Sequence, residues 1–192
     1  MKKIMLVAAL MLSSVATFAQ HAVGSFNIQP KVGLNIANLT DYSKSDARLG
    51  LVAGAEGEYQ ATDIVSVSAG LLYSMQGAKV NQPFVTVTQK LDYINIPITA
   101  NVYVVKGLAV KLGVQPGFKV GDVASVDAAR ALNVALPGKA KSFDLSIPVG
   151  VSYEYNNFQL DARYNWGLTK VYEGNDAKNS VFQITLGYKF DL

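Results

Sequence analysis

Few residues in this chain could carry out chemistry. It has one histidine, His21, and no cysteine, which excludes thiol nucleophiles, thiolate metal sites and disulfides. His21 lies near the N-terminus, away from the loops that would hold a surface active site, so a serine activated by histidine is not expected. The motifs HExxH and GxSxG and the phosphate-binding P-loop do not occur in the sequence.

Acidic pairs are the remaining candidates for catalysis. Asp41 with Asp46, and Asp122 with Asp127, are close enough in sequence for two carboxylates to share a site, as in an aspartyl protease. Acids in polar segments of this kind are more often solvated charges. We therefore expect no catalytic, cofactor-binding or metal-binding residue, and we expect that the protein is not an enzyme.

Other charged residues recur inside stretches where polar and apolar residues alternate. They are Lys31, Glu56, Glu58, Lys111, Asp161, Arg163 and Lys189. Buried charges are tolerated when acids and bases pair, and these nearly balance. The pattern predicts a cluster of salt bridges enclosed by the elements that carry it. A path for protons or ions along the same residues is the alternative.

The elements that carry these charges have the period of β-strands. Apolar residues occupy every second position of 158–168 and of 182–192, with polar residues or glycine between them. Helical spacing fits neither stretch. Eight segments of this kind can be recognised, at 28–38, 48–60, 63–76, 91–104, 107–119, 142–155, 157–169 and 180–192.

The connections between the segments alternate in length. Tight turns at 61–62, 106–107 and 156–157 alternate with longer loops at 39–47, 77–90, 120–141 and 170–179. An even number of strands, with short turns at one end and long loops at the other, is typical of outer-membrane barrels. The expected fold is all-β: an eight-stranded antiparallel transmembrane β-barrel with short periplasmic turns and longer extracellular loops.

Strand length and aromatic residues favour lipid around this barrel. Segments of about 11 to 14 residues exceed the usual length of globular strands and suit a tilted membrane crossing. Aromatic residues near the strand ends could form the two interfacial girdles of such a barrel. The candidates are Tyr73, Phe118, Phe143 and Trp166 on the loop side, and Tyr59, Tyr155, Phe158 and Phe190 on the turn side.

Alternation also assigns a direction to individual side chains. In a membrane barrel the apolar face points to lipid: Leu49, Leu51, Ile94, Ile96, Leu160, Ile184 and Leu186. The charged residues Glu56, Lys111, Asp161, Arg163 and Lys189 then point to the lumen. A soluble sandwich or lipocalin-like barrel would invert the two faces and enclose apolar residues. Strand patterning alone does not separate these alternatives.

The first residues predict export from the cytoplasm. Lys2 and Lys3 precede an apolar run at 4–12 and a small-residue stretch that ends at Ala19, which is the pattern of a secretory signal peptide. The run is shorter than the roughly 20 residues of a membrane helix, which disfavours an uncleaved anchor. We expect residues 1–19 to be cleaved, after Ala19 or Gln20, and residues 20–192 to form the outer-membrane β-barrel domain.

Export changes the charge of the mature chain. Without Lys2 and Lys3, 15 of the 17 Lys and Arg residues remain against 14 Asp and Glu, so the formal net charge falls from +3 to +1. No Lys/Arg cluster follows downstream. The sequence therefore predicts no nucleic-acid partner.

Several short segments resemble the PorT-like group of bacterial outer-membrane β-barrel proteins. They are KVGLNIANL at 31–39, LDYINIPI at 91–98, SIPVG at 146–150, ARYNWGLT at 162–169 and QITLGYKF at 183–190. Together they cover nearly the whole mature chain. The last segment also resembles the C-terminal signal read by the outer-membrane barrel assembly machinery, although this chain ends in Leu192 and not in an aromatic residue.

The resemblance implies a fold and a place in the outer membrane, with outer-membrane lipid and the assembly machinery as partners. It transfers no catalytic or binding residue. Our leading hypothesis is a non-enzymatic structural or surface-interaction barrel without an open pore, whose extracellular loops contact a surface ligand or a partner protein. An accessory role in protein secretion across the outer membrane, which the resemblance to PorT implies, is the alternative. A soluble lipocalin-like barrel that binds an apolar ligand is the third hypothesis.

Overall fold

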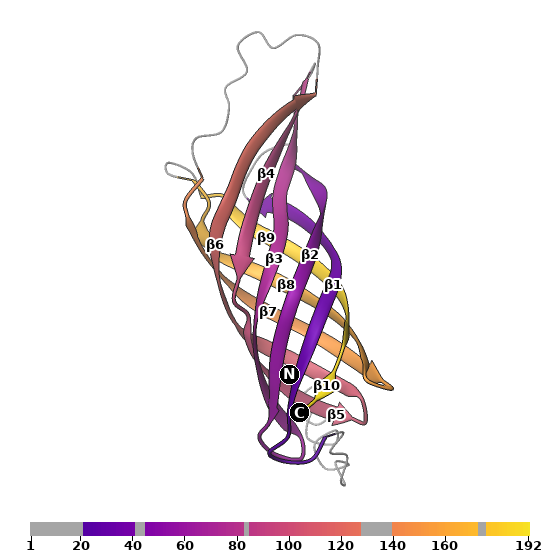
Figure 1. The fold of residues 1–192 in the computed structure, drawn as a ribbon. Coiled ribbons are helices and arrows are strands. Elements are labelled where there is room, and N and C mark those ends of the chain that lie inside the picture. The colour runs from indigo at the N-terminus through magenta and orange to yellow at the C-terminus, as the bar shows by residue number, and fades with distance from the viewer. Residues whose placement is uncertain (1–20, 41–44, 83–84, 128–139, 173–175) are drawn as a thin grey trace, which may run out of the picture.

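The computed structural model describes residues 21–40, 45–82, 85–127, 140–172 and 176–192. Every regular element in them is a β-strand (Figure 1). Among these residues no helix is long and apolar enough to cross a membrane. The predicted signal peptide lies outside the described residues. The strands are β1 (Phe26–Thr40), β2 (Ser45–Gln60), β3 (Val65–Gln82), β4 (Val85–Asn95), β5 (Ile98–Val105), β6 (Leu108–Asp127), β7 (Phe143–Tyr155), β8 (Phe158–Lys170), β9 (Lys178–Tyr188) and β10 (Phe190–Asp191).

In two places a single crossing strand is divided into two shorter strands. β4 and β5 are separated at Ile96 and Pro97, yet both keep one register against β3, and likewise against β6 around the break. Proline cannot donate to the ladder, which explains the interruption. β9 and β10 are separated at Lys189 and keep one register against β1. The ten strands therefore make eight crossing strands, as predicted.

The sheet closes on itself. Each crossing strand pairs antiparallel with its neighbour in the sequence, and β1 pairs antiparallel with β9 from Lys31↔Gly187 to Thr40↔Lys178. Closure satisfies the backbone of both terminal strands, which an open sheet would leave as edges. The predicted all-β fold, a closed eight-stranded antiparallel barrel, is confirmed.

The predicted loop at 77–90 is wrong. β3 continues to Gln82 and β4 begins at Val85, paired in register from Gly77↔Lys90 to Gln82↔Val85. Gly77 has a φ of 117°, and it lies opposite a register shift between Ala47 and Val52 of β2, so it marks a β-bulge and not the start of a loop. β6 likewise runs to Asp127, past its predicted end. β3, β4 and β6 consequently extend beyond the rest of the wall (Figure 1).

The opposite end of the barrel carries tight turns, as predicted. Asn156 and Asn157 both have positive φ, 47° and 66°, the backbone of the two-residue hairpin turn that matches strand twist. Gly107 has a φ of 82° in the turn before β6. The C-terminus lies at this end (Figure 1), and so does His21, the first described residue.

The two faces of the wall have the orientation of a membrane barrel. Leu49, Leu51 and Leu160 are 69%, 57% and 54% exposed on the outside. Ile184 and Leu186 are also exposed, and Ile94 and Ile96 are half-buried on the same face. All eight aromatic residues assigned to the girdles are exposed on this face. Tyr73 and Phe118 lie in the middle of β3 and β6, because these two strands run past their predicted ends. The interior is polar, so the soluble lipocalin-like alternative, with an apolar interior, is wrong.

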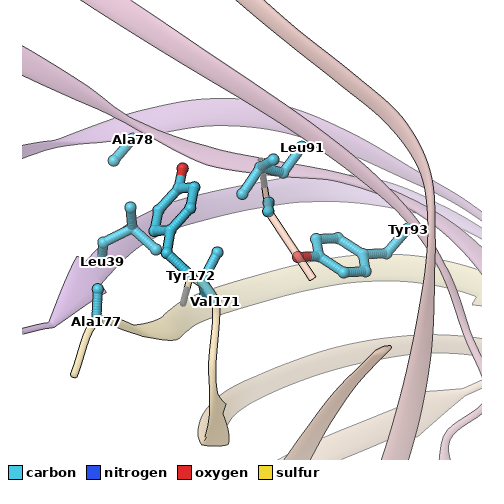
Figure 2. Close-up of a cluster of buried hydrophobic side chains, with 8 residues drawn as sticks. Leu39, Ala78, Leu91, Tyr93, Val171, Tyr172 and Ala177 are labelled. Atoms are coloured by element: carbon cyan, nitrogen blue, oxygen red, sulfur yellow. The ribbon is translucent and has the colours of Figure 1, made fainter. Parts of the chain in front are cut away.

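A small apolar cluster, which we call the cap, fills the interior at the loop end (Figure 2). Its side chains come from β1, β3 and β4 and from the segments that follow β8 and precede β7 and β9. The members are Leu39, Ala78, Leu91, Tyr93, Ala140, Val171, Tyr172 and Ala177. The cap therefore packs apolar side chains at this end, next to the buried polar residues Gln76 and Asn179 that pair with Leu91 and Leu39.

Candidate functional site in the barrel interior

Strand periodicity places five charged side chains at one level of the interior. Lys31 comes from β1, Glu56 from β2, Lys111 from β6, and Asp161 and Arg163 from β8. Each is at most 4% exposed. We call these five residues the central cluster.

Arg163 connects opposite parts of the wall. Its Nε and Nη2 donate to Asp161 Oδ1 and Oδ2 at 2.8 and 2.6 Å, a two-pronged geometry that suits guanidinium and carboxylate. Its Nη1 lies 3.0 Å from Glu56 Oε1. Lys31 Nζ donates to the other oxygen of Glu56 at 2.7 Å. The two carboxylates are therefore held by three different strands.

Asp161 is shared by all three bases of the central cluster. Lys111 Nζ lies 2.7 Å and Lys31 Nζ 3.4 Å from Asp161 Oδ2. Gln159 Oε1 accepts a hydrogen bond of 3.3 Å from each of the two lysines. Three bases face two acids here, which leaves the central cluster with one excess positive charge.

A second group, the lower cluster, lies nearer the turns and carries the opposite excess. Lys189 Nζ lies 2.9 Å from Glu58 Oε2 and 2.7 Å from Glu154 Oε2. Tyr103 and Ser66 donate their hydroxyls to Glu58 Oε1 at 2.6 and 2.5 Å. Two acids and one base leave one excess negative charge, which offsets that of the central cluster. Buried charges are tolerated in this balanced arrangement.

His21 extends the lower cluster to the turn end. Its Nε2 lies 3.0 Å from Glu154 Oε1 and its Nδ1 3.2 Å from Asp191 Oδ1. Both ring nitrogens are donors only in the imidazolium. The hydrogen bond to Glu154 raises the pKa of His21 above its usual value, against the opposing effect of burial. The ring lines a cavity of about 640 Å³ together with Lys106, Tyr153, Glu154, Tyr155, Asn156, Asn157 and Asp191.

The structure confirms the predicted enclosure of charges. All seven charged residues named from the sequence lie in the two clusters. The sequence prediction missed Glu154, Tyr103 and His21. For Glu154 and Tyr103 a signal was present, because each follows an inward residue, Ser152 or Asn101, by two positions.

The acid pairs considered for catalysis are not brought together among the described residues. Asp41 lies outside the described residues, as does the side chain of Asp127. Asp122 forms an ion pair with Lys119, Oδ2 to Nζ 2.7 Å, and accepts a hydrogen bond from Gln89 at 2.9 Å. Within the described part of the chain, no three His, Cys, Asp or Glu residues form a group that could hold a metal ion. The ion pairs of the interior join side chains from different strands, an arrangement that suits a structural role.

A closed antiparallel wall, an exposed apolar belt between aromatic girdles and a charge-filled interior define an integral β-barrel of the outer membrane. The chain belongs to the outer membrane protein beta-barrel domain family, whose sequence pattern matches residues 18–173. The predicted outer-membrane location is confirmed.

Solved structures show the same fold at low sequence identity. Ail, the attachment invasion locus protein of Yersinia pestis, is 16% identical over 88% of this chain and 100% of its own, with a TM-score of 0.53. Neisserial surface protein A is 18% identical over 86% and 97%, with a TM-score of 0.52. OprG from Pseudomonas aeruginosa is 15% identical over 88% and 97%, with a TM-score of 0.51. No curated protein sequence matches the chain.

Proposed function

We propose that this protein is a non-enzymatic surface-interaction barrel without an open pore. The observation that carries the proposal is the filled interior, in which the largest charged side chains, Arg163, Lys111 and Lys189, are at most 2% exposed. An eight-stranded barrel has an interior just wide enough for side chains. Here those side chains are tied across the lumen by ion pairs.

The filled interior has two different barriers in series. An ion passing along the axis would have to separate the paired charges of the central and lower clusters, which are costly to leave unpaired once buried. It would then meet the cap, whose aliphatic side chains cannot replace the water around a charge. We therefore expect this protein to contact its ligands or partners through the outer surface of the barrel and not through the lumen.

The loop end offers a projecting surface for a partner. β3, β4 and β6 extend beyond the wall there (Figure 1), and loops on a rigid scaffold commonly carry binding functions. Ail, which shares the fold, is called an attachment invasion locus protein and has been solved with the heparin analogue sucrose octasulfate. By analogy, we propose a surface ligand or partner protein that contacts the loop end of this barrel.

The pore-free part of the proposal is tested by conductance. Folded protein, identified by a shift in gel mobility between unboiled and boiled samples, would be inserted into planar lipid bilayers and compared with protein-free detergent. We expect no current steps above the detergent control. Reproducible steps from the folded fraction would show that the interior opens and would contradict a closed lumen.

The surface role is tested by shortening the loop-end hairpin. Replacing residues 79–88 with Asn-Gly should leave the barrel below it intact, because this type of dipeptide forms a tight hairpin turn. Cells that display the full-length or shortened protein would be compared for adhesion to heparin-coated and dextran-coated surfaces. Adhesion that requires heparin and the hairpin supports the proposal. Equal adhesion of cells that lack the protein would contradict it for this class of ligand.

A role in protein secretion is the alternative, supported by the resemblance of the segments around Ile36, Tyr93 and Trp166 to the PorT-like group. Deleting the gene and comparing the proteins released by the cells would separate the two functions. A loss of secreted proteins, with co-purification of large secretion components, would favour the secretion role. Fold similarity alone transfers this role weakly.

We also propose that residues 1–19 are a cleaved signal peptide and that the barrel assembly machinery inserts the mature chain. Sequencing the N-terminus of protein from outer membranes tests the first point. A mature chain that starts at Gln20 or His21 is expected, and a chain that starts at Met1 would contradict it.

A further inference from the structure

We propose that Lys141, Lys170 and Lys178 form a binding site for the phosphate groups of outer-leaflet lipids. The inference rests on the outer-membrane location and not on the proposed surface role. It concerns the outside of the wall at the loop ends of β7, β8 and β9, a different face from the lumen.

The three lysines come from neighbouring strands. Lys170 and Lys178 are directly paired across β8 and β9. Lys141 precedes β7, and its backbone nitrogen donates to the oxygen of Val171, the residue after Lys170, at 2.8 Å. Lys141 and Lys170 are exposed, and Lys178 is half-buried. The site therefore presents ammonium groups from three adjacent positions along the rim.

The lysines follow directly on the apolar belt of the barrel. Going toward the loops, Phe143, Leu168 and Phe182, at 45%, 43% and 39% exposure, are the last large exposed apolar residues of these strands. Trp166, 59% exposed, lies on the same face of β8 as Lys170. Aromatic residues lie at the membrane–water interface in such barrels, and the next level outward is that of the lipid headgroups. The lysines are placed at this level.

The charge at this rim is not neutralised by the described residues around it. Asp176 is the one acid with a described ion pair to the site, with Oδ1 2.5 Å from Lys170 Nζ, and it is itself exposed. Asp144, at the start of β7, is buried and hydrogen-bonded to Thr169. Among the described residues, three bases against one exposed acid leave an excess of two positive charges. Like charges that face each other across a strand pair are destabilising, and a bound phosphate would relieve that repulsion.

The distribution of lysines over the rest of the exterior supports an anionic partner on the loop side. Among the described residues, exposed lysines at the loop end are Lys79, Lys90, Lys141 and Lys170, whereas Lys106 is the exposed lysine at the turn end. Anionic lipid attracts lysines near its surface with about 1 kcal/mol each. Lys141 and Lys170 of this group belong to the proposed site, together with the half-buried Lys178.

The single tryptophan provides a local reporter. Trp166 is the one tryptophan of the chain, and it lies within the same stretch of β8 as Lys170. Folded protein in uncharged detergent would be titrated with lipid A, which bears phosphate groups, with dephosphorylated lipid A, and with inorganic phosphate. Tryptophan fluorescence gives the apparent affinity in each arm. We expect saturable binding of lipid A, weakened by salt, and no comparable response to the other two probes.

The variant K170Q/K178Q tests the residues, with K106Q at the turn end as a matched control. An energy of about 1 kcal/mol per lysine corresponds to about a fivefold loss of affinity for each, and roughly 25-fold for the pair. K106Q should bind like the unmodified protein. Unchanged lipid A binding by the folded double variant would overturn the proposal, as would equal binding of dephosphorylated lipid. Equal affinity for inorganic phosphate would assign the site to a free anion and overturn the lipid source.

If the double variant does not fold, which would be seen as loss of the gel mobility shift, the variant K141Q takes its place. This substitution lies outside the paired strands of the rim, so it removes one charge without touching the β8–β9 ladder. About a fivefold loss is again expected. Unchanged binding by folded K141Q would then count against a three-lysine site.

Discussion

Asp161 and Arg163 are two residues apart on β8, and the guanidinium of Arg163 holds both carboxylate oxygens of Asp161 at 2.8 and 2.6 Å. The same guanidinium reaches Glu56 on β2 at 3.0 Å. Lys111 from β6 and Lys31 from β1 also reach Asp161. One carboxylate therefore joins side chains from three strands, and its removal would leave the surrounding bases without their shared partner.

Asp161→Asn should destabilise the barrel by about 3 to 5 kcal/mol, because it leaves buried positive charges uncompensated. Urea unfolding in lipid vesicles, followed by the fluorescence of Trp166, measures the change in free energy of unfolding. Asp176→Asn, on the exposed rim, is the matched control and should unfold like the unmodified protein. A D161N barrel of unchanged stability would mean that the ion pairs of the central cluster do not stabilise the barrel.

Leu51→Arg should impair insertion more than Leu160→Arg. Both leucines face lipid, but Leu160 is two residues from the turn-side aromatic Phe158, whereas Leu51 lies well inside β2. An arginine costs about 2 to 4 kcal/mol at the midplane and roughly 0 to 1 near the interface. The folded fraction after refolding into vesicles, read from gel mobility, gives the order. Equal, complete folding of both variants would contradict the assigned orientation.

Gly77→Ala should cost more stability than Gly24→Ala. Both glycines have positive φ, 117° and 88°, so both substitutions carry the penalty of that conformation, about 1 to 3 kcal/mol. At Gly77 the added methyl group would also overlap the backbone oxygen of Gln89, whereas nothing lies within 4 Å of it at Gly24. Unfolding in urea distinguishes the two. Equal losses would show that the bulge can shift to accept a side chain.

The contact of His21 with Glu154 and Asp191, which holds the segment before β1 against the turn end, should weaken as the pH rises. The pKa of His21 is raised in the folded state by its hydrogen bond to Glu154, so the stabilisation is fully present below the unfolded value of about 6.5 and is lost as the pH rises through the higher folded pKa. Since the chain has no cysteine, Val23→Cys can carry a single fluorescent label next to His21. Label mobility should increase over this range.

His21→Gln in the labelled protein is the control for that titration. It retains a side chain able to hydrogen-bond but removes the group that titrates near neutral pH. Its label mobility should not change with pH between roughly pH 5 and pH 9. A pH response of the same size with and without His21 would assign the effect to another group.

The number of crossing strands and the direction of their side chains followed from the sequence alone, whereas the outer ends of β3, β4 and β6 did not. Alternation is a local property of the chain: once Leu160 points outward, Asp161 must point inward, whatever the rest of the protein does. The same parity placed Lys31, Glu56 and Lys111 in the lumen and the aromatic residues of the predicted girdles on the outside. Parity also points Glu154 inward, two positions after the inward Ser152, although Glu154 was not among the predicted interior charges.

The pairing of each acid with its base depended on the three-dimensional arrangement of the strands. Lys31 reaches Glu56 25 positions away and Asp161 130 positions away, and these pairs depend on strand register and on closure of β1 against β9. The bulge at Gly77, the cap formed by Leu39, Tyr93 and Tyr172, and the docking of His21 likewise depend on contacts between distant segments. Alternation specifies the face of each residue but not its height along the barrel axis, because that height is set by the register of each strand against its neighbours.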